Sequence, residues 1–310
     1  MVRIVVIGAV NWDTTFFVNR FPRSGAEVVV ERISHVPGGK AGNTAVAVAR
    51  LLGPNQSAIV AGLGRDAIGT EQVKIFENEN VVTTGLKFFD NAESGQAYVA
   101  IDEKGANTIF KLWGANALLT PSDLDDPVRR GLIEEAAIVA IMGSPLETAI
   151  RMAEIAKELG KIVAWDPGVH AKLGLEKVHR LVKDIDYLLA NENEIANLTG
   201  ARNPTAAAKR LTTANGDLKT VVKLGARGCI MFSQEKKESL QSPDLSAIGL
   251  KVVNTLGCGD AFLGAFIAAL SEGVSDTEAL KWGNCAGALK ATRFESRGSP
   301  NRDTLLKYLS

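Results

Sequence analysis

Residues 136–165 read AAIVAIMGSPLETAIRMAEIAKELGKIVAW, and this stretch indicates the fold. The short apolar runs Ala136 to Met142 and Lys161 to Trp165 are typical of strands buried on both faces of a parallel sheet. Between them, residues Leu146 to Leu159 have the mixed apolar and polar pattern of an amphipathic helix. A strand, a helix and a second strand in this order predict a βαβ unit.

The same alternation extends on both sides of this unit. Further buried strands are predicted at residues 3–9, Ser57 to Leu63, Tyr187 to Ala190 and Thr220 to Leu224. A small-residue helix is predicted from Asn43 to Leu52. The 310 residues could form one large α/β domain or two ordinary ones, and we expect one domain over residues 1–310. Ligands are then expected at the carboxyl ends of its parallel strands.

A second, smaller β element is predicted to cover that edge. Glu27 to His35 is strand-like, and Gln96 to Asp102 with Asn107 to Trp113 predicts a β-hairpin joined at Glu103 to Ala106. We expect a small β-sheet lid from about residues 12–36 and 90–115.

Composition excludes several classes of function. Lys plus Arg and Asp plus Glu both number 35, so net charge favours neither nucleic acid nor an anionic membrane as a partner. The longest apolar runs, such as Ala261 to Leu270, are too short to span a bilayer. The N-terminus enters a strand without a secretory signal, and three scattered cysteines predict neither disulfides nor structural zinc. We expect a cytoplasmic enzyme.

The most informative motif is VNTLGCGDAF at residues 253–262. Glycines let the backbone approach a ligand, and the N-terminus of a helix offers unpaired N–H groups to an anion. Asp260 then lies where a carboxylate could take a proton from an attacking hydroxyl, which is the combination that phosphoryl transfer needs. The alternative is a tight turn in which Asp260 caps the helix.

This motif resembles the second signature of the PfkB (ribokinase-like) family, D-T-x-G-A-G-D. The resemblance implies that Asp260 is the catalytic base and that Gly257, Cys258 and Gly259 form the anion hole. Cys258 replaces the usual Ala, a small change because the backbone N–H groups bind the anion. Asn254 replaces an Asp that helps many relatives to hold a monovalent cation, so potassium activation is doubtful here.

Two earlier segments resemble the family's acceptor site. The first signature matches Gly38, Gly39, Lys40 and Asn43, where glycines admit a sugar and an Asn offers donor and acceptor to a diol. Alternatively, Asn43 only caps the helix that follows. Asn11 and Asp13 lie where the family places an Asp that accepts hydrogen bonds from substrate hydroxyls; otherwise Asp13 is an exposed turn residue.

Later segments resemble the nucleotide side of the family site. Asn191 and Glu194 match its N-x-x-E motif, which implies that Glu194 organises Mg²⁺ through water; alternatively, they start a helix with acidic residues. Lys223, Gly225 and Gly228 match a strand-to-loop that borders the nucleotide, and Asn284 is expected beside it. Taken alone, the Lys223 segment predicts a hairpin.

These segments occur in the family's order over about residues 5–290. Together they imply a ribokinase-like three-layer α/β/α fold with a mostly parallel central sheet. They also imply a kinase that uses ATP and Mg²⁺ on a small-molecule acceptor. A homodimer formed through the lid is a further expectation.

Three alternatives for the function remain open, and two of them differ in the acceptor. Asp166-Pro167-Gly168 and the hairpin end Phe110-Lys111-Leu112-Trp113 resemble archaeal nucleoside kinases, in which Trp113 or Phe110 would stack on a base. Equally, these aromatic side chains seal the lid. The alternatives are a nucleoside kinase acting on the 5′-hydroxyl, a sugar or sugar-phosphate kinase with Lys111 or Arg65 on the phosphate, and a sensor that binds without turnover.

Overall fold

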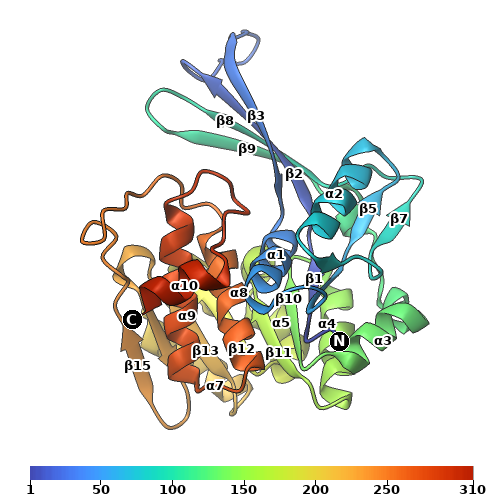
Figure 1. Ribbon diagram of the computed structural model, residues 1–310, viewed down its shortest axis with the longest axis vertical. Helices are drawn as coiled ribbons and strands as arrows, with labels where there is room; N and C mark the ends of the chain where they lie inside the picture. Colours follow the sequence, from blue (N-terminus) through green and yellow to red (C-terminus); the bar gives the residue numbers. More distant parts are fainter. Residues whose placement is uncertain (310) are drawn as a thin grey trace.

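A computed structural model describes residues 1–309, and in this range nine strands form one large sheet (Figure 1). Their order is β15-β14-β13-β12-β11-β10-β1-β4-β6, and all neighbours are parallel except β13–β14 and β14–β15. The strands are β1 (Ile4–Gly8), β4 (Ser57–Val60), β6 (Val81–Val82), β10 (Ile138–Met142), β11 (Ile162–Asp166), β12 (Tyr187–Asn191), β13 (Lys219–Lys223), β14 (Cys229–Phe232) and β15 (Lys237–Leu240).

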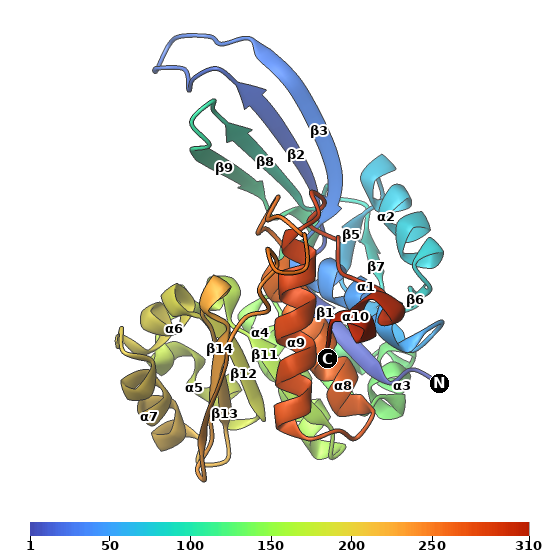
Figure 2. The ribbon, with the colours of Figure 1, turned by 60° about the vertical axis from the view of Figure 1, so that its left-hand side comes forward.

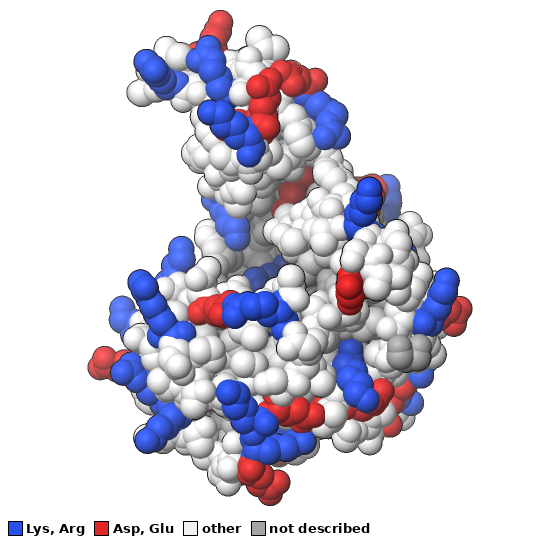
Figure 3. Space-filling view, turned by 90° about the vertical axis from the view of Figure 1, so that its left-hand side faces the viewer, with Lys and Arg blue, Asp and Glu red and all other residues white. Residues whose placement is uncertain are grey.

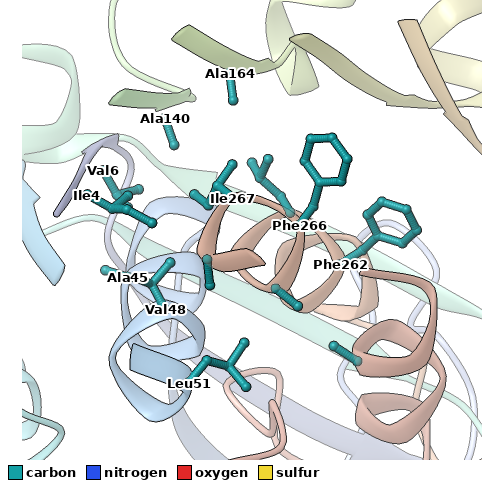
Figure 4. Packing of buried hydrophobic residues seen from close by; sticks show 14 of the residues in the cluster. Ile4, Val6, Ala45, Val48, Leu51, Ala140, Ala164, Phe262, Phe266 and Ile267 are labelled. Atoms are coloured by element: carbon teal, nitrogen blue, oxygen red, sulfur yellow. The ribbon is translucent and has the colours of Figure 1, made fainter. Parts of the chain in front are cut away.

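Helices cover both faces of this sheet and make three layers (Figures 1 and 2). Alternate residues of β1 enter two separate cores: Ile4 and Val6 pack with α1 and α8, whereas Val5 and Ile7 pack with α4 and α5. Figure 4 shows the first core, with Val48 of α1 and Ile267 of α8 turned toward the sheet. The helices are α1 (Lys40–Leu52), α2 (Ala67–Asn78), α3 (Pro127–Glu135), α4 (Leu146–Glu158), α5 (Leu175–Lys183), α6 (Glu192–Thr199), α7 (Pro204–Ala214), α8 (Cys258–Ser271), α9 (Asp276–Ala291) and α10 (Arg302–Leu309).

A separate small sheet projects from the body of the molecule (Figure 2). Within the described residues it has the order β3-β2-β8-β9, formed by β2 (Asn11–Val18), β3 (Val30–Gly38), β8 (Gln96–Ile101) and β9 (Asn107–Leu112). Strands β2 and β8 are parallel, and the other two pairs are antiparallel. A short parallel pair, β5 (Gly62–Gly64) and β7 (Lys87–Phe89), lies beside α2.

The predicted fold class is confirmed: a large, mostly parallel sheet between helices, with a small separate sheet. Some boundaries were wrong. The strand predicted from Ser57 to Leu63 divides into β4 and β5, which belong to different sheets. Helix α1 begins at Lys40 rather than Asn43. No helix in residues 1–309 is long and apolar enough to cross a membrane.

Candidate active site

Polar side chains gather where the parallel strands of the large sheet end. Asp166, Asn191 and Lys223 are the last residues of β11, β12 and β13, and Gly8 ends β1. Because parallel strands end at one edge, these residues face a common region. In Figure 3 the surface is hollowed between the small sheet and the body, and basic and acidic atoms are visible inside the hollow.

Asp260 lies in the first turn of α8, whose N-cap is Gly257. Gly257 has φ 84°, a left-handed conformation that favours glycine. The alternative that Asp260 is itself the N-cap is therefore wrong: it is the third residue of the helix. The residue is 5% exposed, and its carboxylate accepts a hydrogen bond from Asn43 Nδ2 at 2.8 Å. Burial raises the pKa of Asp260, although Lys40 opposes this.

Asn43 lies inside α1, so the alternative that it caps this helix is also wrong, because the N-cap is Gly39. Its amide is buried between two segments far apart in sequence. Nδ2 donates to Asp260, and Oδ1 accepts from Arg297 Nε at 3.4 Å. Arg297 is 4% exposed and also donates to the Gly38 carbonyl and to Gln72. Burial lowers the pKa of Arg297 to about 9.

Two lysines converge on the fully buried carboxylate of Asp166. Lys40 Nζ donates to Oδ1 at 2.9 Å, and Lys223 Nζ donates to Oδ2 at 2.8 Å. Burial by itself would raise the pKa of Asp166. The positive charges of Lys223 and Lys40 have the larger combined effect, so the pKa of this carboxyl is lowered. Lys40 also lies 3.5 Å from Glu194 Oε1 and 4.0 Å from Asp260 Oδ1. The Asp166 carboxylate therefore holds the two ammonium groups, which we call the lysine centre, in fixed positions near Asp260.

Asp13 enters the same region from β2 of the small sheet. Its side chain is buried, and a Cβ at position 38 would collide with its carboxylate and force it to move, so Gly38 leaves room for Asp13. Burial raises the pKa of Asp13 to about 6, against the opposing charges of Arg297 and Lys111, and the charge of Asp260 adds to the increase. Asp13 is therefore not the exposed turn residue of the alternative interpretation.

The register of the small sheet separates the hairpin side chains by face. Asp13, Ala97 and Lys111 are aligned across β2, β8 and β9, so Lys111 lies on the face of Asp13. Phe110 lies on the opposite face and is 67% exposed. The prediction that Phe110 could stack on an acceptor in this site is therefore wrong.

Trp113, just past β9, borders a cavity of about 300 Å³ lined also by Asn116, Gly143, Ser144, Val169 and His170. Asn116 Nδ2 donates to Asn11 Oδ1 at 3.0 Å, which connects the cavity to the start of β2. Ser144 Oγ and His170 Nδ1 are buried and have no hydrogen-bond partner within residues 1–309. Burial lowers the pKa of His170, so its ring is neutral at neutral pH. With a neutral His170 and the Trp113 ring in its lining, this cavity suits an uncharged group.

The residues predicted for the nucleotide side lie on several different elements: the start of α6, the turn after β13, and α9. Asn191 and Glu194 form a capping box at the start of α6, so the helix-start alternative is correct for their backbone contacts. Glu194 Oε1 nevertheless faces Lys40. Gly225 and Gly228 lie at the two ends of the short turn between β13 and β14. Asn284 of α9 donates to the Gln241 carbonyl at 2.6 Å.

Sequence reasoning missed four residues of this region. Asp166 was noted only as part of a segment, although its place at the end of a predicted strand was a usable signal. Arg297, Ser144 and His170 carried no local signal, because only long-range contacts bring them to the site.

Residues 1–303 match the family model described as pfkB family carbohydrate kinase. The chain belongs to this family. It is 31% identical to a Lactococcus lactis ribokinase, covering 96% of this chain and 93% of that one. It is 30% identical to an ATP-dependent ribose-1-phosphate kinase of Halopiger xanaduensis, covering 100% and 99% of the two chains. The resemblance that the motifs carry is thus confirmed.

Solved structures of pfkB kinases share this fold. Arabidopsis thaliana ribokinase complexed with ribose and ATP superposes with a TM-score of 0.86 at 27% identity, covering 100% of this chain and 99% of the other. A Methanocaldococcus jannaschii nucleoside kinase gives 0.83 at 20% identity, covering 100% and 98%; at that identity the likeness concerns the fold alone. The chain is a ribokinase-like kinase, and ATP as its co-substrate is consistent with the Arabidopsis complex.

Proposed function

We propose that this kinase transfers the terminal phosphoryl group of ATP to the primary hydroxyl of a ribose-type acceptor. The buried carboxylate of Asp260 carries the proposal. It lies at the N-terminus of α8, beside the two lysines on Asp166 and opposite Asp13 of the small sheet. In this proposal one region contains a general base, an anion hole and a carboxylate that accepts hydrogen bonds from the sugar hydroxyls.

Each group has a distinct task in this mechanism. Asp260 takes the proton of the acceptor hydroxyl as its oxygen bonds to phosphorus and the bond to the leaving nucleotide oxygen breaks. The N–H groups of Gly257, Gly259 and Asp260 and the Lys40 ammonium stabilise charge on the transferred group, whereas the Cys258 N–H donates to the Thr255 carbonyl at 3.2 Å. Asp13 and the first turn of α1 orient the sugar. Lys223, Gly225, Gly228 and Asn284 are assigned to the nucleotide side.

The favoured acceptor is ribose or ribose 1-phosphate. Relatives named for these two activities share 30–31% identity with this chain over nearly its whole length. Lys111 supports a phosphorylated acceptor, because its ammonium acts on Asp13 from the same face of the small sheet. This small sheet, from about residues 12–36 and 90–115, would close over the bound sugar as a lid.

A nucleoside is the second candidate, and the cavity beside Trp113 is the specific observation that favours it. A nucleobase placed there would stack on Trp113 and satisfy Ser144 Oγ and His170 Nδ1.

An acceptor screen tests the proposal. The purified chain would be assayed with ribose, ribose 1-phosphate and the common ribonucleosides, each with ATP, ADP and GTP as donors. Higher kcat/KM for ribose or ribose 1-phosphate is expected. Preference for nucleosides would favour the second candidate, and binding without turnover on any acceptor would favour the sensor.

We propose that Mg²⁺ is held near Glu194 and Asn191, mainly through water. Mg²⁺ keeps most of its water and needs few carboxylates, and Glu194 is a hard oxygen donor at the rim of the lysine centre. Within residues 1–309 no group of three or more His, Cys, Asp or Glu side chains could hold a metal. When bound, Mg²⁺ would neutralise charge on the nucleotide phosphates.

Glu194→Gln is expected to lower kcat and raise the Mg²⁺ concentration needed for half-maximal activity. Gln can replace Glu in a capping box, so the start of α6 should persist and only the charge changes. Glu192→Gln is the matched control, because Glu192 lies in the same turn and pairs with exposed Arg227. Equal Mg²⁺ titrations for wild type and Glu194→Gln would remove Glu194 from the metal site.

We also propose a homodimer through the outer face of the small sheet, where Phe16, Ile33, Tyr98 and Phe110 alternate with the residues facing the site. Phe110→Asp is expected to convert the dimer into a monomer, as measured by sedimentation or light scattering. Ile109→Asp is the control, since Ile109 is half exposed on the other face. A wild-type protein that is already monomeric would contradict the proposal.

A further inference from the structure

Lys290 is a fully buried lysine near the segment that precedes α8. It lies in the last turn of α9, and its side chain is 0% exposed. Its Nζ donates to the backbone carbonyls of Asn254 at 2.9 Å and Arg293 at 3.1 Å. No carboxylate of residues 1–309 lies within salt-bridge distance of it. A buried ammonium is costly, so these two carbonyls and the helix C-terminus must hold it.

The two carbonyls belong to segments that meet just before the anion hole. The Val253 and Asn254 N–H groups donate to the Ala291 carbonyl, at 2.7 and 3.1 Å. The Asn254 side chain donates from Nδ2 to the Phe294 carbonyl at 2.6 Å and accepts at Oδ1 from the Leu256 N–H. Gly257, the N-cap of α8, follows directly. Lys290 and Asn254 thus fix the backbone that leads into the anion hole.

A free monovalent cation does not fit this arrangement. Many relatives use an Asp at position 254 to help hold such an ion, but Asn254 has no charge and turns an N–H donor toward Phe294. The point where the Asn254 and Arg293 carbonyls converge is filled by the Lys290 ammonium. Nearby Cys258, Glu295 and Asp260 favour a positive charge there, although burial, the largest effect, lowers the pKa of Lys290.

We propose that the Lys290 ammonium is a built-in substitute for a monovalent cation, holding the anion-hole backbone without an added ion. Lys290 is then a positioning residue, because it acts on the reaction through residues 254–257. This inference deepens the proposed function and rests on the assignment of Gly257–Asp260 as the anion hole.

The first test uses the wild-type protein. Its kinase rate and Tm would be measured in potassium, sodium and choline chloride at equal ionic strength. Both are expected to be the same in the three salts. A rate and a Tm that depend on potassium would overturn the proposal.

The second test removes the ammonium in two ways. Lys290→Ala leaves a space lined by carbonyls, and a loss of charged hydrogen bonds of this kind should lower kcat about tenfold or more. Potassium or ammonium ions should restore its kcat and raise its Tm, since both ions suit carbonyl oxygens. Lys290→Met fills the space with an apolar chain and should not be restored. Lys281→Ala, at an exposed lysine of the same helix, should resemble wild type.

If Lys290→Ala responds to potassium and ammonium no more than Lys281→Ala does, the proposal fails. If Lys290→Ala does not fold in choline buffer, recovery of folded protein in potassium or ammonium supports the proposal, and equal failure in all buffers overturns it. The Tm comparison needs no turnover, so it separates this inference from a failure of the proposed kinase function.

Discussion

Replacing Asp260 with Asn is expected to lower kcat by about 10²–10⁴-fold, the usual range for loss of a positioned general acid or base. Asn keeps the size and polarity of the side chain but cannot accept the proton of the acceptor hydroxyl. Its Oδ1 can still accept the hydrogen bond that Asn43 donates to Asp260. The measurement is kcat with saturating acceptor and ATP, together with the Kd of the nucleotide, which should change little.

The stability of this variant separates catalysis from folding. Because burial raises the pKa of Asp260, its ionised form costs folding free energy at neutral pH, and a neutral Asn removes that cost. The Tm of Asp260→Asn should therefore equal or exceed that of wild type. Asp303→Asn, an exposed first-turn Asp of α10, is the matched control with unchanged kcat. A folded Asp260→Asn protein with kcat within a few-fold of wild type would exclude Asp260 as the base.

Asp13→Ala is expected to lower kcat/KM for the acceptor by roughly ten- to a hundredfold, the effect of losing a charged hydrogen-bond partner. The Asp13 carboxylate lies against Gly38, and the charge of Asp260 contributes to raising its pKa, so we assign Asp13 to the acceptor rather than to the nucleotide. The KM for ATP should therefore stay near its wild-type value. Asp90→Ala, which removes an exposed carboxylate after β7, should leave both constants unchanged. Unaltered acceptor kinetics in Asp13→Ala would show that the sugar binds elsewhere.

The ionisation of Asp13 should also make kcat/KM for the acceptor depend on pH. Asp13 must be ionised to accept two hydroxyl hydrogen bonds, and its pKa is raised to about 6 by burial. As pH falls through about 6, the carboxyl gains a proton and kcat/KM for the acceptor should decline. Asp13→Asn should lose this step and keep only the decline caused by protonation of Asp260. A wild-type kcat/KM that is flat from pH 7 to the ordinary pKa of Asp, about 4, would contradict this assignment.

The sequence by itself determined the fold class and the order of the motifs. Apolar runs such as Ala136 to Met142 fill both faces of a strand, and this local pattern requires a covered parallel sheet. The glycine–aspartate motif at Gly257–Asp260 and the first signature at Gly38–Asn43 are contiguous, so their chemistry could be predicted from neighbouring residues alone. Helix boundaries were less certain, because glycine and Asn both occur at helix starts: α1 begins at Lys40 and α8 at Cys258.

Only the tertiary structure decided which side chains meet. The hydrogen bond between Asn43 and Asp260 joins residues 217 positions apart. Asp166 receives both lysines because β11 ends between the segments that carry them. The register of the small sheet directs Lys111 toward the site and Phe110 away from it. The burial of Lys290 follows from the packing of its helix against the segment that precedes α8. Periodicity and spacing act over a few residues, whereas these contacts depend on how distant elements pack, so no local pattern could predict them.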